Sequence, residues 1–138
     1  MSNTSNKTSN KEVIRAADAP APVGPYNQAI AVPATSKLVF LAGQVAINPA
    51  SGKIEATTIE AQTEQVIQNI KAVLAAAGGD LSHVVKTTVF LANMTDFPTM
   101  NGVYSRHFLD PAPARSTIQV ARLPLDALVE IECTAALP

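Results

Sequence analysis

The sequence predicts an α+β fold in which a mixed β-sheet carries two helices on one of its faces. Its 138 residues fit a single domain. Two segments have apolar residues three and four positions apart, as in amphipathic helices, and several shorter segments read as strands. The elements follow in the order strand, strand, helix, strand, helix, strand, strand. Because crossovers between parallel strands are right-handed, both helices are expected on the same side of the sheet.

The two helices have the clearest patterns. The first is predicted over residues 59–77, where Thr57 or Thr58 can cap its start and Gly78 can end it. The second is predicted to begin after Asp96, with this aspartate as its N-cap. Its inner side is expected to consist of four large side chains, each three or four positions from the next: Phe97, Met100, Tyr104 and Phe108.

Five segments are predicted to be strands. Residues 26–32 alternate between apolar and polar, and residues 84–91, 115–121 and 128–136 are rich in β-branched and apolar side chains. Residues 38–42 are continuously apolar. Such a run is typical of a strand that is buried on both faces of its sheet.

The buried strand predicts an oligomer. Two helices cover one sheet face only, so a monomer would leave the other apolar face in water, which soluble proteins avoid. Charged residues are 15% of the chain, below the usual ~25%. We therefore expect a homo-oligomer whose open sheet faces turn inward.

Composition argues against several classes of protein. The net charge is −1 without a basic run, and aromatic residues are 4%, so nucleic acid is not expected as a partner. No segment approaches the ~18 apolar residues of a membrane span.

Residues 1–13 are predicted to be a disordered polar tail before a single domain at 14–138. The tail has no secretory signal, and the lone Cys133 fits a reducing compartment, so the expected location is cytoplasmic.

Arg115 is the first candidate for chemistry. It begins a strand directly after a loop stiffened by Pro111 and Pro113, and strand alternation places the polar Thr117 and Gln119 on its side. A fixed guanidinium beside a polar strand face suits bidentate binding of a small carboxylate. The alternative is an edge-strand arginine that simply pairs with a glutamate.

Glu130 and Glu132 are the second candidates, on a strand expected to neighbour that of Arg115. They project to one face about 7 Å apart, and an oligomer covering this face would bury at least one of them. A covered carboxylate can accept and donate a proton. The alternative is that the two glutamates simply lie on a solvent-exposed strand face, and this reading is favoured for Glu132. Arginine for a carboxylate and an acid for protons form a minimal site for hydrolysing a small imino acid or keto acid derivative.

Other residues are weaker candidates for a functional role. His83 and His107 have no metal-like spacing, so no metal site is expected. Cys133 is expected in the apolar core, and Tyr26 either in the core or beside a pocket. No cofactor fingerprint is present.

Four segments carry a resemblance to a known family. They are "APAPVGPYNQA", "VFLAGQVAINPASGKI", "AAAGGDLSHVVKTTVFLANMTDFPTMNGVY" and "PARSTIQVARLPLDALVEIE", and the similarity runs from about Ile14 to the end of the chain. The chain resembles the Rid (YjgF) family, most closely its RidA-like deaminases. The resemblance implies a chorismate-mutase-like fold and a homotrimer with sites between subunits. It also implies cofactor-free hydrolysis of 2-iminopropanoate and 2-iminobutanoate, released by pyridoxal-phosphate enzymes, to 2-keto acids and ammonia.

The resemblance also implies residue roles. Arg115 matches the arginine that binds the substrate carboxylate, and Glu130 matches the acid that activates water. The substrate pocket is implied to include Tyr26, Gly43, Asn101, Arg115 and Thr117. Many active members have cysteine where this chain has Thr117, whose hydroxyl can still hold a water. Two other functions stay open: a non-catalytic carboxylate-binding or regulatory protein, and an endoribonuclease, which some relatives are reported to be.

Overall fold

The computed structural model describes residues 11–138. Most of the predicted polar tail lies outside the described residues. The first strand, β1 (Glu12–Ile14), begins within the last two residues of that predicted tail. Glu12 and Val13, which the sequence pattern assigned to the tail, therefore belong to a strand.

The main sheet has four strands in the order β3-β8-β6-β7. These are β3 (Lys37–Gln44), β8 (Val129–Leu137), β6 (Val84–Leu91) and β7 (Ala114–Gln119). β6 and β7 run parallel, and the other two pairings are antiparallel. The predicted mixed sheet is confirmed.

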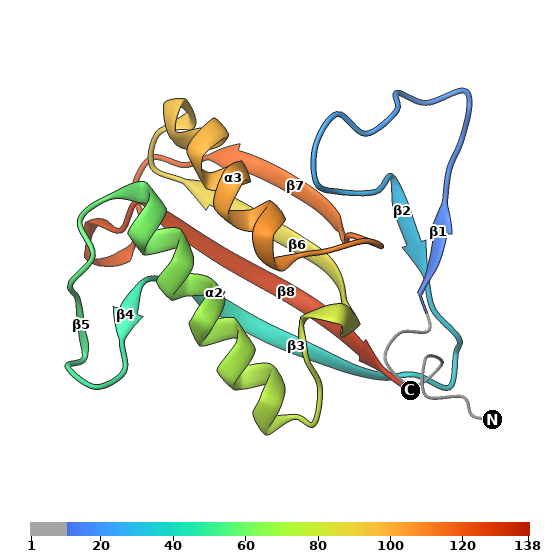
Figure 1. The fold of residues 1–138 in the computed structure, drawn as a ribbon, viewed down its shortest axis with the longest axis horizontal. Coiled ribbons are helices and arrows are strands. Elements are labelled where there is room, and N and C mark those ends of the chain that lie inside the picture. Colours follow the sequence, from blue (N-terminus) through green and yellow to red (C-terminus); the bar gives the residue numbers. More distant parts are fainter. Residues whose placement is uncertain (1–10) are drawn as a thin grey trace.

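Both helices lie side by side on one face of this sheet (Figure 1). They are α2 (Ile59–Ala76) and α3 (Phe97–His107). The Thr58 hydroxyl caps α2 by accepting a hydrogen bond from Ala61 N. The α3 connection leads from β6 to its parallel neighbour β7, a type of crossover that is right-handed in nearly all proteins. Neither described helix is long and apolar enough to cross a membrane.

The core lies between the helices and the sheet. α2 contributes Val66, Ile67, Ile70 and Leu74, all with no exposed surface. The inner side of α3 was predicted correctly, since Met100, Tyr104 and Phe108 are buried and Phe97 packs against the same cluster. Alternate residues of the strands complete this core: Leu41, Val89, Leu91, Val129, Ile131, Cys133 and Ala135.

The opposite face of the sheet is apolar and open in the single chain. Phe40 is 73% exposed, Leu38 49% and Ile118 45%, whereas Leu41 on the helix side is buried. The segment predicted to be covered on both faces is thus covered on one. This is the uncovered face from which the sequence predicts an oligomer.

Short strands lie outside the main sheet. β1 pairs with β2 (Ala29–Ala31), and β4 (Ile47–Asn48) pairs with β5 (Lys53–Ile54). The run at 26–32, predicted as a strand of the main sheet, is therefore wrong in length and in partner. Three single-turn helices complete the described part of the chain: η1 (Leu81–His83), η2 (Met94–Asp96) and η3 (Pro124–Asp126).

Candidate active site

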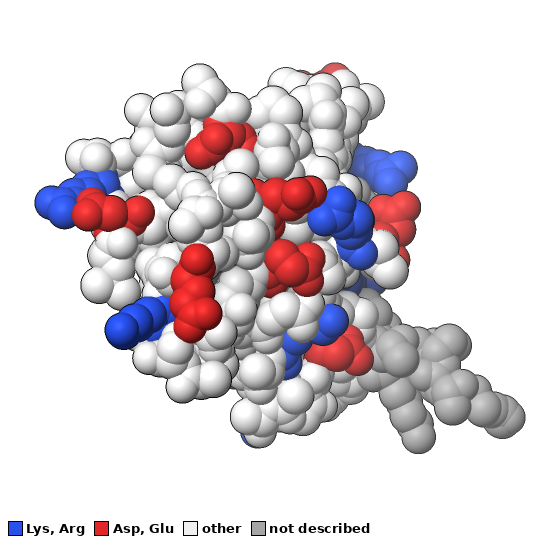
Figure 2. All heavy atoms as spheres, turned by 60° about the vertical axis from the view of Figure 1, so that its left-hand side comes forward, with Lys and Arg blue, Asp and Glu red and all other residues white. Residues whose placement is uncertain are grey.

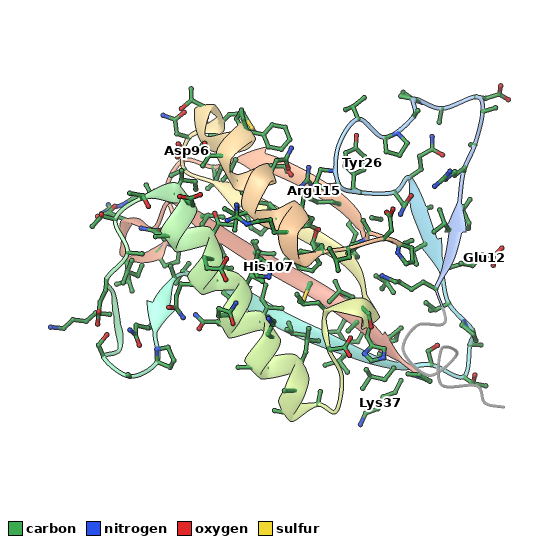
Figure 3. All side chains as sticks on the ribbon, viewed as in Figure 1. Glu12, Tyr26, Lys37, Asp96, His107 and Arg115 are labelled. Carbon is green, nitrogen blue, oxygen red and sulfur yellow. The ribbon has the colours of Figure 1, made fainter. Side chains whose placement is uncertain are left out.

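Arg115 lies near the start of β7 and points to the helix side of the sheet. Its register partner on β6 is Thr87, which is buried against α3. Figure 3 shows Arg115 beside α3 with Tyr26 of the preceding loop next to it. Three aromatic rings surround the guanidinium carbon, with centroids at 4.8 Å (Tyr104), 5.4 Å (Tyr26) and 5.6 Å (Phe97). These cation–π contacts hold the guanidinium without neutralising it.

The polar contact of Arg115 is to an amide. Its Nη1 donates a hydrogen bond of 2.7 Å to Asn101 Oδ1 on α3. No carboxylate of the described residues forms an ion pair with Arg115. Burial lowers the pKa of Arg115, and the Tyr104 and Tyr26 rings oppose this shift, but an arginine stays charged in proteins. The alternative of a glutamate-paired arginine is therefore wrong among residues 11–138, and the cation is available to an anionic ligand.

Tyr104 forms a rigid support beneath Arg115. Its hydroxyl lies 2.8 Å from Thr87 Oγ1, and its ring stacks on Phe108 at 4.3 Å. Burial raises the pKa of Tyr104 to about 12, so it stays neutral. The sequence pattern placed Phe97 and Tyr104 only in the core. Nothing in their spacing indicated that Arg115 would lie against their rings.

The loop carrying Tyr26 is fastened beside the start of β7. The buried Asn27 donates from Nδ2 to Ala112 O at 2.8 Å, and its backbone N–H donates to Pro113 O at 3.2 Å. The Tyr26 hydroxyl accepts a hydrogen bond of 3.4 Å from Val23 N. Because Asn27 is fixed on both sides, the neighbouring Tyr26 ring is held over the guanidinium.

Thr117 follows two residues after Arg115 and so lies on the same side of β7. Its Oγ1 is buried and has no hydrogen-bond partner within residues 11–138. Buried hydroxyls are normally paired, so an unpaired one next to a cation is a candidate ligand contact. Gln119, the next residue on this side, already has a hydrogen-bond partner, since its Oε1 accepts a hydrogen bond of 2.7 Å from Met94 N.

Glu130 lies on the other face of the sheet. It pairs in register with Phe90, and its neighbours Val129 and Ile131 point into the core under the helices. Its carboxylate lies over Gly43. A Cβ added at Gly43 would come within 2.9 Å of Glu130 Cδ and closer still to Oε2. Gly43 therefore leaves the space that the Glu130 side chain occupies.

The backbone is irregular at the same point. β3 pairs regularly with β8 up to Leu41, and the register then shifts before Gln44, as in a β-bulge. The bulge displaces the backbone at Gly43 next to Glu130. Bulges of this kind often adjust the position of functional side chains.

One chain does not bring Arg115 and Glu130 together. The expectation that their strands are neighbours is wrong, because β6 separates β7 from β8. The two side chains also point to opposite faces. Tyr26, Asn101, Thr117 and Arg115 form one half-site on the helix side. Gly43 and Glu130 form a second half-site on the open face.

The cysteine and the two histidines considered in the sequence are buried or hydrogen-bonded within the fold, away from both half-sites. Cys133 is a buried free thiol whose pKa burial raises to about 12. The buried His83 accepts from Asp80 N at 3.0 Å in a capping box. His107 lies 2.8 Å from Glu64 of α2, and this hydrogen bond lowers the pKa of Glu64. Among the described residues, no cluster of three or more His, Cys, Asp or Glu side chains could hold a metal.

A sizeable cavity lies away from both half-sites. It has a volume of about 750 Å³ and lies between α2 and residues 107–111, with Lys11 at its edge. It contains none of the residues singled out as catalytic or substrate-binding in the sequence.

Comparison with known proteins shows which family the chain is similar to. The family model described as "Endoribonuclease L-PSP" matches residues 16–137. The chain is 50% identical over 127 residues to "Reactive Intermediate Deaminase A, chloroplastic" of Arabidopsis thaliana, spanning 92% of this chain and 66% of that relative. It is 42% identical over 125 residues to the "2-iminobutanoate/2-iminopropanoate deaminase" of Mus musculus, spanning 91% and 90%.

A solved structure extends the comparison to the fold. "E. coli TdcF with bound serine" is 37% identical, with a TM-score of 0.69, and the match covers 92% of this chain and 99% of that one. With a family model spanning most of the chain and relatives at this identity, the protein belongs to the Rid family.

Proposed function

We propose that this protein hydrolyses small 2-imino acids, such as 2-iminopropanoate and 2-iminobutanoate, to 2-keto acids and ammonia. The observation that carries the proposal is Arg115, a guanidinium fixed by three rings and by Asn101 that has no carboxylate partner among the described residues. Such a cation is preorganised for the planar carboxylate of a substrate. The deaminase names of two relatives support the reaction class.

In this proposal Arg115 binds and orients the substrate carboxylate, and Glu130 moves protons. Glu130 accepts a proton from water as the water oxygen adds to the carbon of the protonated imine, giving a neutral carbinolamine. Glu130 then donates this proton to the amino nitrogen, the C–N bond breaks and ammonia leaves, and the carbinolamine hydroxyl proton passes to Glu130 as the C=O bond of the keto acid forms. The residues named here supply binding and proton transfer without a cofactor.

Assembly is part of the proposal. Arg115 and Glu130 lie on opposite faces, so one site needs the Arg115 half-site of one subunit and the Glu130 half-site of another. The open face with Phe40, Leu38 and Ile118 is the apolar surface through which such subunits would associate. A homotrimer with three such sites satisfies both requirements. Light scattering of the purified protein should give a trimeric mass.

The two alternatives use different features. A non-catalytic carboxylate-binding or regulatory protein would use the same Arg115 half-site but would not need Glu130 over Gly43. An endoribonuclease, the description carried by the family model, would need a basic surface. Figure 2 shows acidic and basic side chains scattered over one face without an extended basic patch.

The predicted cytoplasmic location stays a prediction, and one relative is chloroplastic by name.

A trapping assay tests the proposal. The protein is added to a serine or threonine dehydratase reaction that contains semicarbazide, which captures the released imine. We expect less semicarbazone while amino-acid consumption is unchanged, because the imine is hydrolysed before it is trapped. Unchanged semicarbazone with both substrates would reject the hydrolase and favour the binding protein.

A further inference from the structure

The cavity between α2 and the segment that leads from α3 to β7 has the size and lining of a small-molecule site. Its volume of about 750 Å³ lies within the range of such sites, roughly 300–1,000 Å³. Its walls include four apolar side chains: Ala72 and Ala75 of α2, Leu81 of η1, and Leu109. Leu109 is 69% exposed, so this apolar wall is open to a ligand from solution.

The amine of Lys11 lies at this cavity and is held by main-chain acceptors. Its Nζ donates to Pro111 O at 2.6 Å and to Val84 O at 3.1 Å. Burial lowers the pKa of Lys11 from its usual 10.5 to about 8, with Asp80 opposing the shift. A neutral amine still has two N–H bonds for these two carbonyls, and its lone pair makes it a nucleophile. The cavity therefore contains an amine that can react with a ligand.

The charged groups around the cavity balance one another. Lys11 and Lys71 are basic, and Asp80 and Asp110 are acidic. The remaining titratable residue of the lining is His107, at the end of α3 (Figure 3), which shares a hydrogen bond with a glutamate of α2. An anionic ligand would meet both aspartates, whereas the apolar walls favour a ligand that buries apolar area. An uncharged and largely apolar molecule fits this lining best.

We propose that Lys11 is a covalent attachment site for small uncharged aldehydes, which enter the cavity and form an imine with Nζ. The lone pair of Nζ adds to the aldehyde carbon, and one amine hydrogen moves to the carbonyl oxygen, giving a carbinolamine. The second hydrogen on nitrogen leaves with the hydroxyl group as water while the C=N bond forms. Protonation of the imine restores one N–H bond, which can donate to Pro111 O. This site is separate from the Arg115 and Glu130 half-sites and does not depend on the proposed hydrolysis.

Labelling with two aldehydes tests the site, hexanal as an uncharged apolar probe and glyoxylate as a small anionic one. The full-length protein is incubated with each at about pH 7.5, where an ordinary lysine is protonated, together with cyanoborohydride, which reduces the imine to a stable amine. Peptide mass spectrometry measures labelling at Lys11 and at Lys71, an exposed amine of the same cavity. Ala75→Phe fills the cavity from α2. Ala76→Phe is its matched control, since Ala76 is exposed on the same helix outside the lining.

Hexanal should label Lys11 at least about tenfold faster than Lys71, because the neutral amine reacts and the apolar walls retain the aldehyde. Glyoxylate should lose most of this preference. Ala75→Phe should lower hexanal labelling of Lys11 severalfold without changing that of Lys71, and Ala76→Phe should behave like the parent, with circular dichroism checking that both variants fold. Equal labelling of the two lysines by hexanal would overturn the site. A preference for Lys11 that is the same with glyoxylate, or that Ala75→Phe leaves unchanged, would also overturn it.

Discussion

At the scale of single residues, Arg115 and Glu130 have different surroundings and hence different expected roles. Arg115 is enclosed by rings and an amide on the helix side. Glu130 is half-buried on the open face over Gly43. The first arrangement fixes a cation for ligand binding, and the second places a carboxylate where a partner subunit can cover it. Substitutions can separate these two roles.

Arg115→Lys should reduce kcat/KM by roughly ten- to hundredfold. Lysine keeps the charge but loses the planar fork and the stacking on the Tyr104 ring, and a lost bond to a charged group is worth about 1.5–3 kcal/mol. Arg122→Lys is the control, since Arg122 is exposed and pairs only with Asp126. Steady-state kinetics checks both variants. Parental kcat/KM in Arg115→Lys would mean that another group binds the carboxylate.

Glu130→Gln should lower kcat by about a hundredfold or more while pyruvate still binds, because glutamine keeps the shape but cannot accept a proton. Glu132→Gln is matched to it, since Glu132 lies on the same face and is exposed. We expect parental turnover from this control. Full turnover in Glu130→Gln would show that Glu130 is structural, and the proposed proton transfer would be wrong.

At the scale of elements, the sequence predicted α2, β6 and the inner side of α3 well because each depends on local periodicity. It misplaced residues 26–32 because pairing with β1 is a long-range choice that alternation does not encode. The adjacency of β7 and β8 was wrong for the same reason, since β6 enters between them. Arg115 was found from its polar strand, but its aromatic surroundings depend on how α3 crosses β7.

Lys11 links three elements and gives a pH dependence. Its Nζ donates to Val84 O at the start of β6 and to Pro111 O before β7. Burial lowers the pKa of Lys11 to about 8, with Asp80 opposing the shift. The unfolded chain keeps this proton up to about pH 10.5, so between these values it binds more protons than the folded protein. The contribution of Lys11 to stability should therefore rise with pH over this interval.

Thermal melts of the parent and of Lys11→Met between pH 7 and 10 test this sign. The melting temperature of the parent relative to the variant should rise by a few degrees with pH, because solvent screening reduces the effect of a half-buried group. Lys71→Met, at an exposed lysine of the same cavity, should run parallel to the parent. A parent-minus-Lys11→Met difference that is flat or falls with pH would contradict the assignment.

At the scale of the whole molecule, the open apolar face and the divided site have one explanation. A sheet covered on one side leaves Phe40 exposed, and the proposed catalytic pair, Arg115 and Glu130, is divided between the two faces. Association of identical chains can cover the face and complete the site together. The sequence predicted association through the run at 38–42. It could not show that Arg115 and Glu130 point apart, because this depends on the register of β6 with both neighbours.

Mixing two inactive variants tests this account most directly. Arg115→Met and Glu130→Gln are each expected to be inactive, and each should form trimers alone. When equal amounts are unfolded together and refolded, a quarter of the sites should combine an intact Arg115 from one chain with an intact Glu130 from another. The account predicts about a quarter of parental imine hydrolysis in the refolded mixture as a whole. Mixed trimers without activity would contradict a site shared between subunits.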